Sequence, residues 1–221
     1  MKAIETEYNG YRFRSRLEAR WAVFFDAVGI LYDYELEGFE FDSGMRYLPD
    51  FYLPELNMWV EVKGVLSDSD ERKIKEFRRF LVKRKESLIV LRDIPPETED
   101  VLDWIYDKYP GWESFSIGCD FPYVPCVCPA CGKVGFEFDG RGWRICDHLN
   151  DSRKMRSIEE HELLQKEIYV TKNGTIKPMK YPEWKGWRMD DKGYTSNHPL
   201  ILEGYKKARQ ARFEHGENPD G

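Results

Sequence analysis

The sequence lacks long apolar runs, repeats, low-complexity tracts and an excess of positive charge. No hydrophobic run approaches the roughly 20 residues needed to span a bilayer, and residues 1–7 contain no signal-peptide core. We therefore expect a soluble, cytoplasmic protein whose five cysteines stay reduced. The net charge of −6 does not by itself favour a nucleic-acid ligand, although binding depends on local patches. At 221 residues and 41% hydrophobic content, the chain can form one domain and a smaller appendage.

A β-hairpin is predicted over residues 48–63. Two alternating segments, 48–53 and 58–63, flank a four-residue turn that contains Pro54 and Asn57. If Leu53 faces Met58, the antiparallel register sorts the side chains onto two faces. One face is apolar and consists of Pro49, Phe51, Leu53, Met58, Val60 and Val62. The other face carries Asp50, Glu61 and Lys63 beside the aromatic pair Tyr52 and Trp59.

The acidic pair on the second face predicts a divalent cation. In this register Asp50 lies opposite Glu61, and like charges at opposed positions are destabilising unless they are neutralised. Magnesium takes one or two carboxylates and completes its coordination with water and phosphate oxygens. Lys63 follows Glu61 on the same side, where it suits a phosphate. The alternative is a solvated sheet face with a surface ion pair, and a one-residue slip of register would move Glu61 to the other face.

These residues resemble the signature of the PD-(D/E)XK nuclease superfamily, in which a Pro-Asp dipeptide (residues 49–50 here) precedes a Glu-x-Lys triplet (residues 61–63). The resemblance covers roughly the first half of the chain. It implies that Asp50 and Glu61 bind magnesium with help from the backbone carbonyl of Val62. It also implies that Lys63 helps to activate water or stabilises the charge of the transition state. The order of the motifs is similar to phage junction-resolving endonucleases and to the endonuclease subunit of heteromeric transposases.

Glu18 has two predicted roles. The family frequently carries a glutamate on a helix before the hairpin, and Glu18 matches that position as a catalytic residue and magnesium ligand. Residues 15–18 also form a capping-box pattern, in which Ser15 is the N-cap and Glu18 bonds back to it. On the predicted helix Glu18 lies at the edge of the core stripe, beside Ala22 and Phe25, from where a carboxylate can reach over the sheet.

The predicted elements follow the order α-β-β-β-α-β. They are a helix over 15–28 ended by Gly29, a strand over 30–36, the hairpin, a helix over 70–85, a strand over 87–91 and a helix over 97–109. The fold class is α/β (more closely α+β), and the resemblance implies a restriction-endonuclease-like core over residues 1–118. A smaller module over 119–221 is expected to contain a zinc-ribbon-like unit, a hairpin over 167–181 and a basic helix over 199–215.

The cysteines of the second half predict a structural zinc site. A Cys-x-x-Cys pair, Cys128 and Cys131, is followed by a short hairpin over 136–144 and a second pair, Cys146 and His148. The second pair is spaced by one residue instead of two, so Cys126 or Asp147 remain as substitutes. Disulfides and a redox Cys-x-x-Cys are weaker alternatives for an intracellular chain.

Two clusters of cationic residues fit the same function. Residues 70–86 contain eight basic against four acidic side chains, and a helix over 11–21 would add Arg12, Arg14, Arg16 and Arg20. Such groups beside a carboxylate cluster suit a phosphate backbone, whereas solvated helix faces with i,i+4 pairs remain the alternative.

We therefore predict a Mg²⁺- or Mn²⁺-dependent deoxyribonuclease with Zn²⁺ as a structural ion. The expected partner is DNA, in recombination, repair or phage DNA processing, and a homodimer is left open. The alternative is an inactive nuclease fold that binds DNA through the zinc module, and a third reading is an enzyme acting on RNA.

Overall fold

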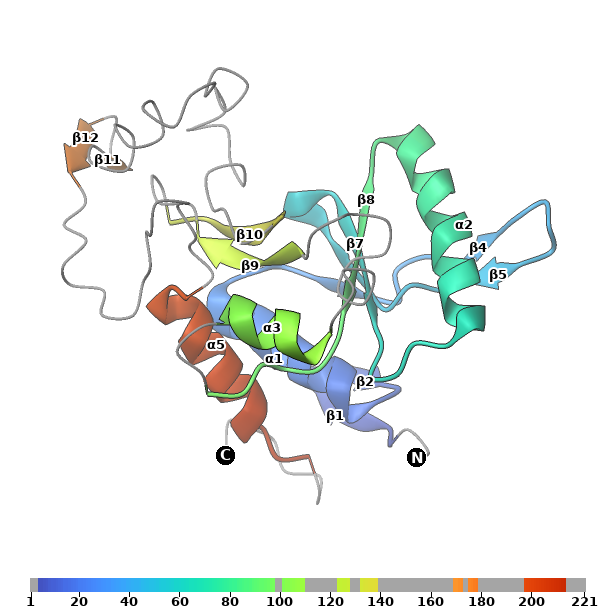
Figure 1. Cartoon of the computed structure of the whole chain (residues 1–221), viewed down its shortest axis with the longest axis horizontal. Coiled ribbons are helices and arrows are strands. Elements are labelled where there is room, and N and C mark those ends of the chain that lie inside the picture. The colour runs from blue at the N-terminus through green and yellow to red at the C-terminus, as the bar shows by residue number, and fades with distance from the viewer. Residues whose placement is uncertain are drawn as a thin grey trace.

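A four-stranded mixed sheet forms the centre of the molecule (Figure 1). The computed structural model describes residues 4–97, 101–109, 123–127, 132–138, 169–172, 175–178 and 197–213. The sheet has the order β3 (Asp33–Tyr34), β6 (Phe51–Leu53), β7 (Met58–Val62), β8 (Ser87–Leu91). β6 is antiparallel to both neighbours, whereas β7 and β8 are parallel and are connected through helix α2 (Asp68–Arg84). The protein is therefore of the mixed α+β class.

The β6–β7 hairpin has the predicted register. Phe51 pairs with Val60, Tyr52 with Trp59, and Leu53 with Met58. The turn is a short 3-10 helix, η1 (Pro54–Leu56), which ends at Asn57 in the left-handed conformation with φ 49° and ψ 49°. One step beyond the last pair, the same register brings Asp50 beside Glu61.

Helix α1 (Arg16–Val28) covers one face of the sheet and has the predicted ends. The Ser15 hydroxyl accepts from the amide of Glu18, and Gly29 ends the helix at φ 75°. Both Ala22 and Phe25 are buried, so the side of α1 expected at the edge of the core is also covered.

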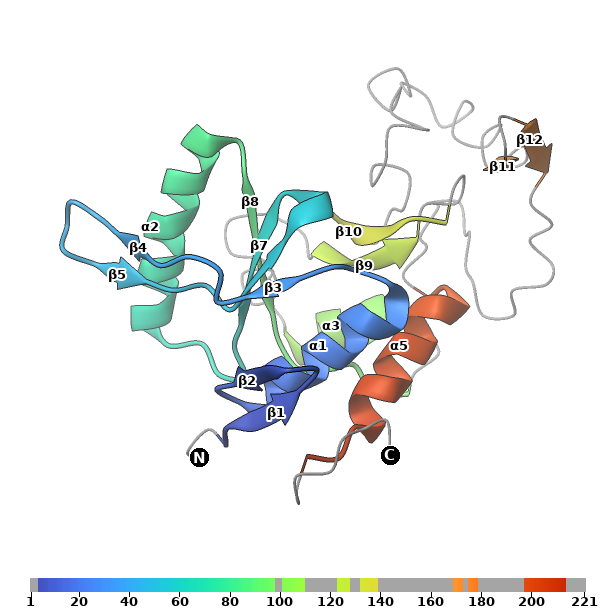
Figure 2. The ribbon, with the colours of Figure 1, turned by 180° about the vertical axis from the view of Figure 1, so that it is seen from behind.

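Helix α5 (Pro199–Gln210) packs against α1, as Figure 2 shows. The rings of Phe24 and Tyr205 stack with centroids 4.8 Å apart. A Cβ at Gly204 would lie 2.6 Å from Val28 Cγ1, so glycine permits this close approach. α5 ends at Gln210, so the helix predicted over 199–215 is shorter at its C-terminal end.

The core on this face combines the apolar side of the hairpin with α1, α3 (Val101–Lys108), α5 and the strand pair β9 (Tyr123–Val127) and β10 (Val134–Phe138). Phe51 and Val60 are fully buried, which confirms the predicted apolar face. Val124, Val134 and Tyr205 belong to the same cluster. One continuous core therefore includes residues from both sides of the expected boundary at 118 and 119.

The opposite face of the sheet is covered by α2 and by a hairpin of β4 (Phe39–Glu40) and β5 (Arg46–Tyr47). Ser67 and Asp70 form a capping box at the start of α2. The apolar stripe of Ile74, Phe77 and Leu81 on α2 is buried against Trp59 and Tyr47. The second face is therefore a second small core and not a solvated surface.

Two hairpins were not predicted. β1 (Thr6–Tyr8) and β2 (Tyr11–Phe13) pair across Asn9 and Gly10, which have φ of 46° and 78°. The helix expected over 11–21 is therefore wrong at its start, because residues 11–13 form a strand. The β4–β5 hairpin also lies outside the predicted elements, and the strand expected over 30–36 is limited to β3.

In the second half, β9 and β10 are antiparallel and flank residues 128–133. No strand was predicted over residues 123–127, which form β9. The hairpin expected over 136–144 is also different, because β10 pairs with the preceding β9; residues 139–144 lie outside the described residues. β11 (Tyr169–Lys172) and β12 (Thr175–Pro178) confirm the hairpin predicted over 167–181. No helix in the described part of the chain is long and apolar enough to cross a membrane.

Candidate active site

Three charged residues of the predicted site lie at one end of the β6–β7 hairpin. Asp50 immediately precedes β6, Glu61 is in β7, and Lys63 follows β7 with its amide bonded to the carbonyl of Leu91 at 2.9 Å. Asp50 is 5% exposed and Glu61 is 3% exposed. These values rule out the solvated sheet face, because both carboxyl groups are removed from water. Carboxylates are almost never buried without partners that neutralise or hydrogen-bond them.

Asp50 is held by the backbone of the neighbouring strand. Its Oδ2 accepts a hydrogen bond from the amide of Val62 at 2.7 Å. Burial, followed by the charges of Glu61 and Glu18, raises the pKa of Asp50 well above its ordinary value, although Lys63 and the Val62 amide oppose this shift. Asp50 therefore lies near enough to Glu61 and Glu18 for their charges to disfavour its ionisation.

Glu61 and Lys63 form a close ion pair, with Nζ 2.6 Å from Oε1. Burial nevertheless raises the pKa of Glu61, against the effect of Lys63. Burial disfavours the charged form of Lys63, but the charges of Glu61 and Asp50 outweigh it and raise the pKa of the amine. The second oxygen of Glu61, Oε2, is buried and has no hydrogen-bond partner among the described residues.

Glu18 is buried and fully engaged by local donors. The Ser15 hydroxyl donates to Oε1 at 2.6 Å, while the Tyr34 hydroxyl and the Arg14 amide donate to Oε2 at 2.6 and 3.1 Å. Burial and the bond to Glu18 raise the pKa of Tyr34 above its ordinary value. Glu18 therefore takes part in the N-terminal cap through the Ser15 hydroxyl, and its role as a metal ligand stays a prediction.

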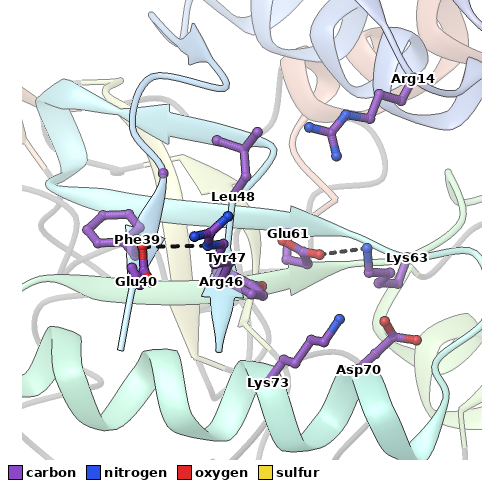
Figure 3. Close-up of a pocket in the computed structure, with 11 residues that line it drawn as sticks. Arg14, Phe39, Glu40, Arg46, Tyr47, Leu48, Glu61, Lys63, Asp70 and Lys73 are labelled. Carbon is purple, nitrogen blue, oxygen red and sulfur yellow. Dashed lines mark ion pairs between the residues drawn. The ribbon is translucent and has the colours of Figure 1, made fainter. Parts of the chain in front are cut away.

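A cavity of about 470 Å³ opens over Glu61 and Lys63 (Figure 3). Its walls come from β4–β5, the start of α2 and the loop before α1. Four cationic side chains line it: Arg14, Arg46, Lys63 and Lys73. Arg14 pairs with Glu35 at 2.5 Å and Arg46 with Glu40 at 3.5 Å. Glu40, Glu61 and Asp70 also line the cavity, so it combines four cationic with three acidic side chains.

Arg46 and Tyr47 are the cavity residues that sequence reasoning missed. Both belong to β5, whose pairing with β4 was not predicted. The available signal was the short turn of Ser43 and Gly44 between two alternating segments. Gly44 has φ 78°, which only glycine adopts without strain.

The basic residues of helix α2 fit both predicted readings, a phosphate-binding surface and a solvated helix face. Lys73 lines the cavity, whereas Lys75 forms an i,i+4 pair with Glu71 at 3.0 Å and Arg84 pairs with Glu86 at 2.9 Å. Most of the charged face of α2 is thus consistent with a solvated helix.

We tested whether the site fits a divalent cation. Within the described ranges, no three Asp, Glu, His or Cys side chains converge into a group that could hold a metal ion. Two carboxylates suffice for magnesium when water and phosphate complete its coordination. Asp50 and Glu61 fit this requirement, since both have raised pKa values and Glu61 Oε2 lacks a partner among the described residues. The assistance expected from the carbonyl of Val62 stays a prediction.

The predicted zinc ligands Cys128, Cys131, Cys146 and His148, with the substitute Asp147, lie outside the described residues. The substitute Cys126 is described: it is fully buried in β9, and its thiol donates to the carbonyl of Gly135 at 3.8 Å. The Cys126 side chain therefore contributes to the pairing of β9 with β10. Cys128 and Cys131 belong to the chain segment between these two strands.

Comparisons with protein-family models, with curated proteins and with solved structures found no match for this chain.

Proposed function

We propose that this protein is a divalent-metal-dependent nuclease that hydrolyses phosphodiester bonds in DNA, with a restriction-endonuclease-like core of the PD-(D/E)XK type. The observation that carries the proposal is the burial of Asp50 and Glu61 side by side, with Glu61 and Lys63 lining a cavity rich in charged side chains. Burying two acids without neutralising them is costly, and an apolar pair would be more stable at these positions. A function that needs the charges accounts for their presence.

Asp50 and Glu61 would hold Mg²⁺ or Mn²⁺, with the Val62 carbonyl and Glu18 as the further ligands that the family resemblance implies. The bound ion supplies polarisation of the scissile phosphate and acidification of water. The Val62 amide fixes Asp50, and the ion pair with Glu61 holds the Lys63 amine at the base of the cavity. There the amine can stabilise the negative charge that grows on the phosphate oxygens.

The cavity supports a polyanionic substrate despite the acidic net charge of the chain. Arg14, Arg46 and Lys73 come from three separate segments of the chain and line the cavity together with Glu61. Cationic side chains that neutralise successive phosphates supply most of the sequence-independent affinity for DNA. The zinc module would then bind DNA or brace the nuclease core, through Cys128, Cys131, Cys146 and His148.

A plasmid-nicking assay with Mg²⁺ or Mn²⁺ tests the proposal. The wild-type protein should convert supercoiled to nicked or linear DNA, and EDTA should abolish the conversion. Asp50→Asn and Lys63→Ala should be inactive while remaining folded. Glu55→Gln is the matched control, because Glu55 lies in the turn of the same hairpin and is exposed. Cleavage that persists in both site variants would refute the site, and labelled RNA in the same assay would reveal a ribonuclease.

A further inference from the structure

The β4–β5 hairpin brings one buried hydroxyl to the candidate site. Tyr47 in β5 is 8% exposed, and its ring packs on Phe77 of α2 with centroids 4.7 Å apart. It lines the same cavity as Glu61, and Figure 3 shows the two side chains next to each other. Neither motif of the family resemblance includes this residue.

The Tyr47 hydroxyl lies near enough to Glu61 to lower the pKa of this carboxylate, although no hydrogen bond of ordinary geometry joins them in the described part of the chain. The Tyr47 hydroxyl and Glu61 Oε2 are both buried and have no hydrogen-bond partner in the described part of the chain. A phenol with an ordinary pKa near 10 is protonated at neutral pH. A protonated phenol is a donor, and a carboxylate oxygen is an acceptor.

The two oxygens of Glu61 have different surroundings. Lys63 occupies Oε1 at 2.6 Å, whereas Oε2 is buried and has no hydrogen-bond partner among the described residues. When a cation binds, it competes with the ammonium of Lys63 for the carboxylate. A neutral donor has no such conflict with the ion, so a hydroxyl can hold the carboxylate in place while the metal is bound.

We propose that Tyr47 is a positioning residue that donates a hydrogen bond to Glu61 Oε2 and orients this carboxylate for the divalent cation. This inference rests on the proposed function, and it adds the β4–β5 hairpin to the machinery of the site. Partners of this kind fix ligand orientation, and their removal typically weakens metal affinity about 10- to 100-fold. The hairpin is in turn held on α2 by Phe77 and by a bond from the Ser43 hydroxyl to Glu76 at 2.6 Å.

The test compares Tyr47→Phe with the wild-type full-length protein. The substitution removes the hydroxyl and keeps the ring on Phe77. Manganese affinity is measured by calorimetric titration of MnCl₂ into zinc-loaded protein, and thermal unfolding is measured without manganese. We expect Tyr47→Phe to weaken Mn²⁺ binding at least about tenfold, with an unfolding midpoint equal to that of the wild type or higher.

Tyr205→Phe is the matched control. Its hydroxyl is also buried without a hydrogen-bond partner among the described residues, but it lies in the α1–α5 core. This variant should bind Mn²⁺ as the wild type does. Equal Mn²⁺ affinity of Tyr47→Phe and wild type would overturn the role of Tyr47 and leave the proposed function intact. Absence of Mn²⁺ binding to the wild type would overturn both.

Discussion

The two faces of the central sheet are both buried, yet they are built differently. The face under α1 and α5 is apolar throughout, from Phe51 and Val60 to Phe24 and Tyr205. The face under α2 is apolar at one end, around Trp59, and carries Glu61 and Asp50 at the other. The first face contributes only to stability, whereas the second keeps charged groups where the fold alone would favour apolar ones.

The largest expected effect concerns the apolar face. Phe51→Ala should lower the free energy of unfolding by about 3–5 kcal/mol, because a fully buried ring would leave a cavity. Urea denaturation followed by tryptophan fluorescence measures it. Glu55→Ala, at the exposed turn of the same hairpin, should stay within about 0.5 kcal/mol of the wild type. A loss under 1 kcal/mol for Phe51→Ala would contradict the packing described for this face.

A smaller loss is expected where α5 meets α1. Gly204→Ala would place a methyl group 2.6 Å from Val28 Cγ1 and 3.0 Å from the Phe24 ring. Overpacking of this kind typically costs about 1–3 kcal/mol. The same denaturation experiment should show this loss, and an unchanged or higher stability would mean that α5 does not pack this closely on α1.

On the polar face, removing a charge should change binding and leave folding intact. Arg46→Ala should lower the slope of log affinity against log salt for duplex DNA by about one, with unchanged unfolding. Arg46 lines the cavity and its side chain is highly exposed. Arg79→Ala is the control, because Arg79 is an exposed residue of α2 outside the cavity lining. Equal slopes for Arg46→Ala and wild type, measured by fluorescence anisotropy, would exclude a phosphate contact at Arg46.

The smallest expected effect is a gain in stability instead of a loss. The pKa of Asp50 is raised on folding, so the folded state binds more protons than the unfolded state, and stability should fall as pH rises above the ordinary carboxyl range near 4. Without metal at pH 7, Asp50→Asn should therefore be more stable than the wild type by about 1 kcal/mol. Its advantage should shrink toward pH 4, and Mg²⁺ should stabilise the wild type alone. Equal pH dependence of the two proteins would contradict the repulsion between Asp50 and Glu61.

Sequence reasoning succeeded where structure is set locally. The ends of α1 follow from Ser15 and Gly29, whereas α2 begins at Asp68, two residues before its predicted start, after the N-cap Ser67. The register of the β6–β7 hairpin follows from alternation and from the length of the turn. These features depend on neighbouring residues, so the sequence contains enough information to predict them.

The features that were missed have two causes. The β1–β2 hairpin carries an Asn-Gly turn signal at residues 9–10, and the β4–β5 hairpin carries a turn signal at Ser43 and Gly44; neither signal was used. The packing of α5 on α1 and the position of Tyr47 beside Glu61 are contacts between distant segments. No local pattern encodes them, so the cationic walls of the cavity could not be assembled from the sequence.

A crystal of the full-length protein soaked in MnCl₂ tests the central claim most directly. An anomalous difference map collected near the manganese edge should show a peak bridging the carboxylates of Asp50 and Glu61. Asp50→Asn crystals treated in the same way serve as the reference and should lack it. A wild-type map without a peak between these two side chains would contradict the assignment of this site to metal-dependent hydrolysis.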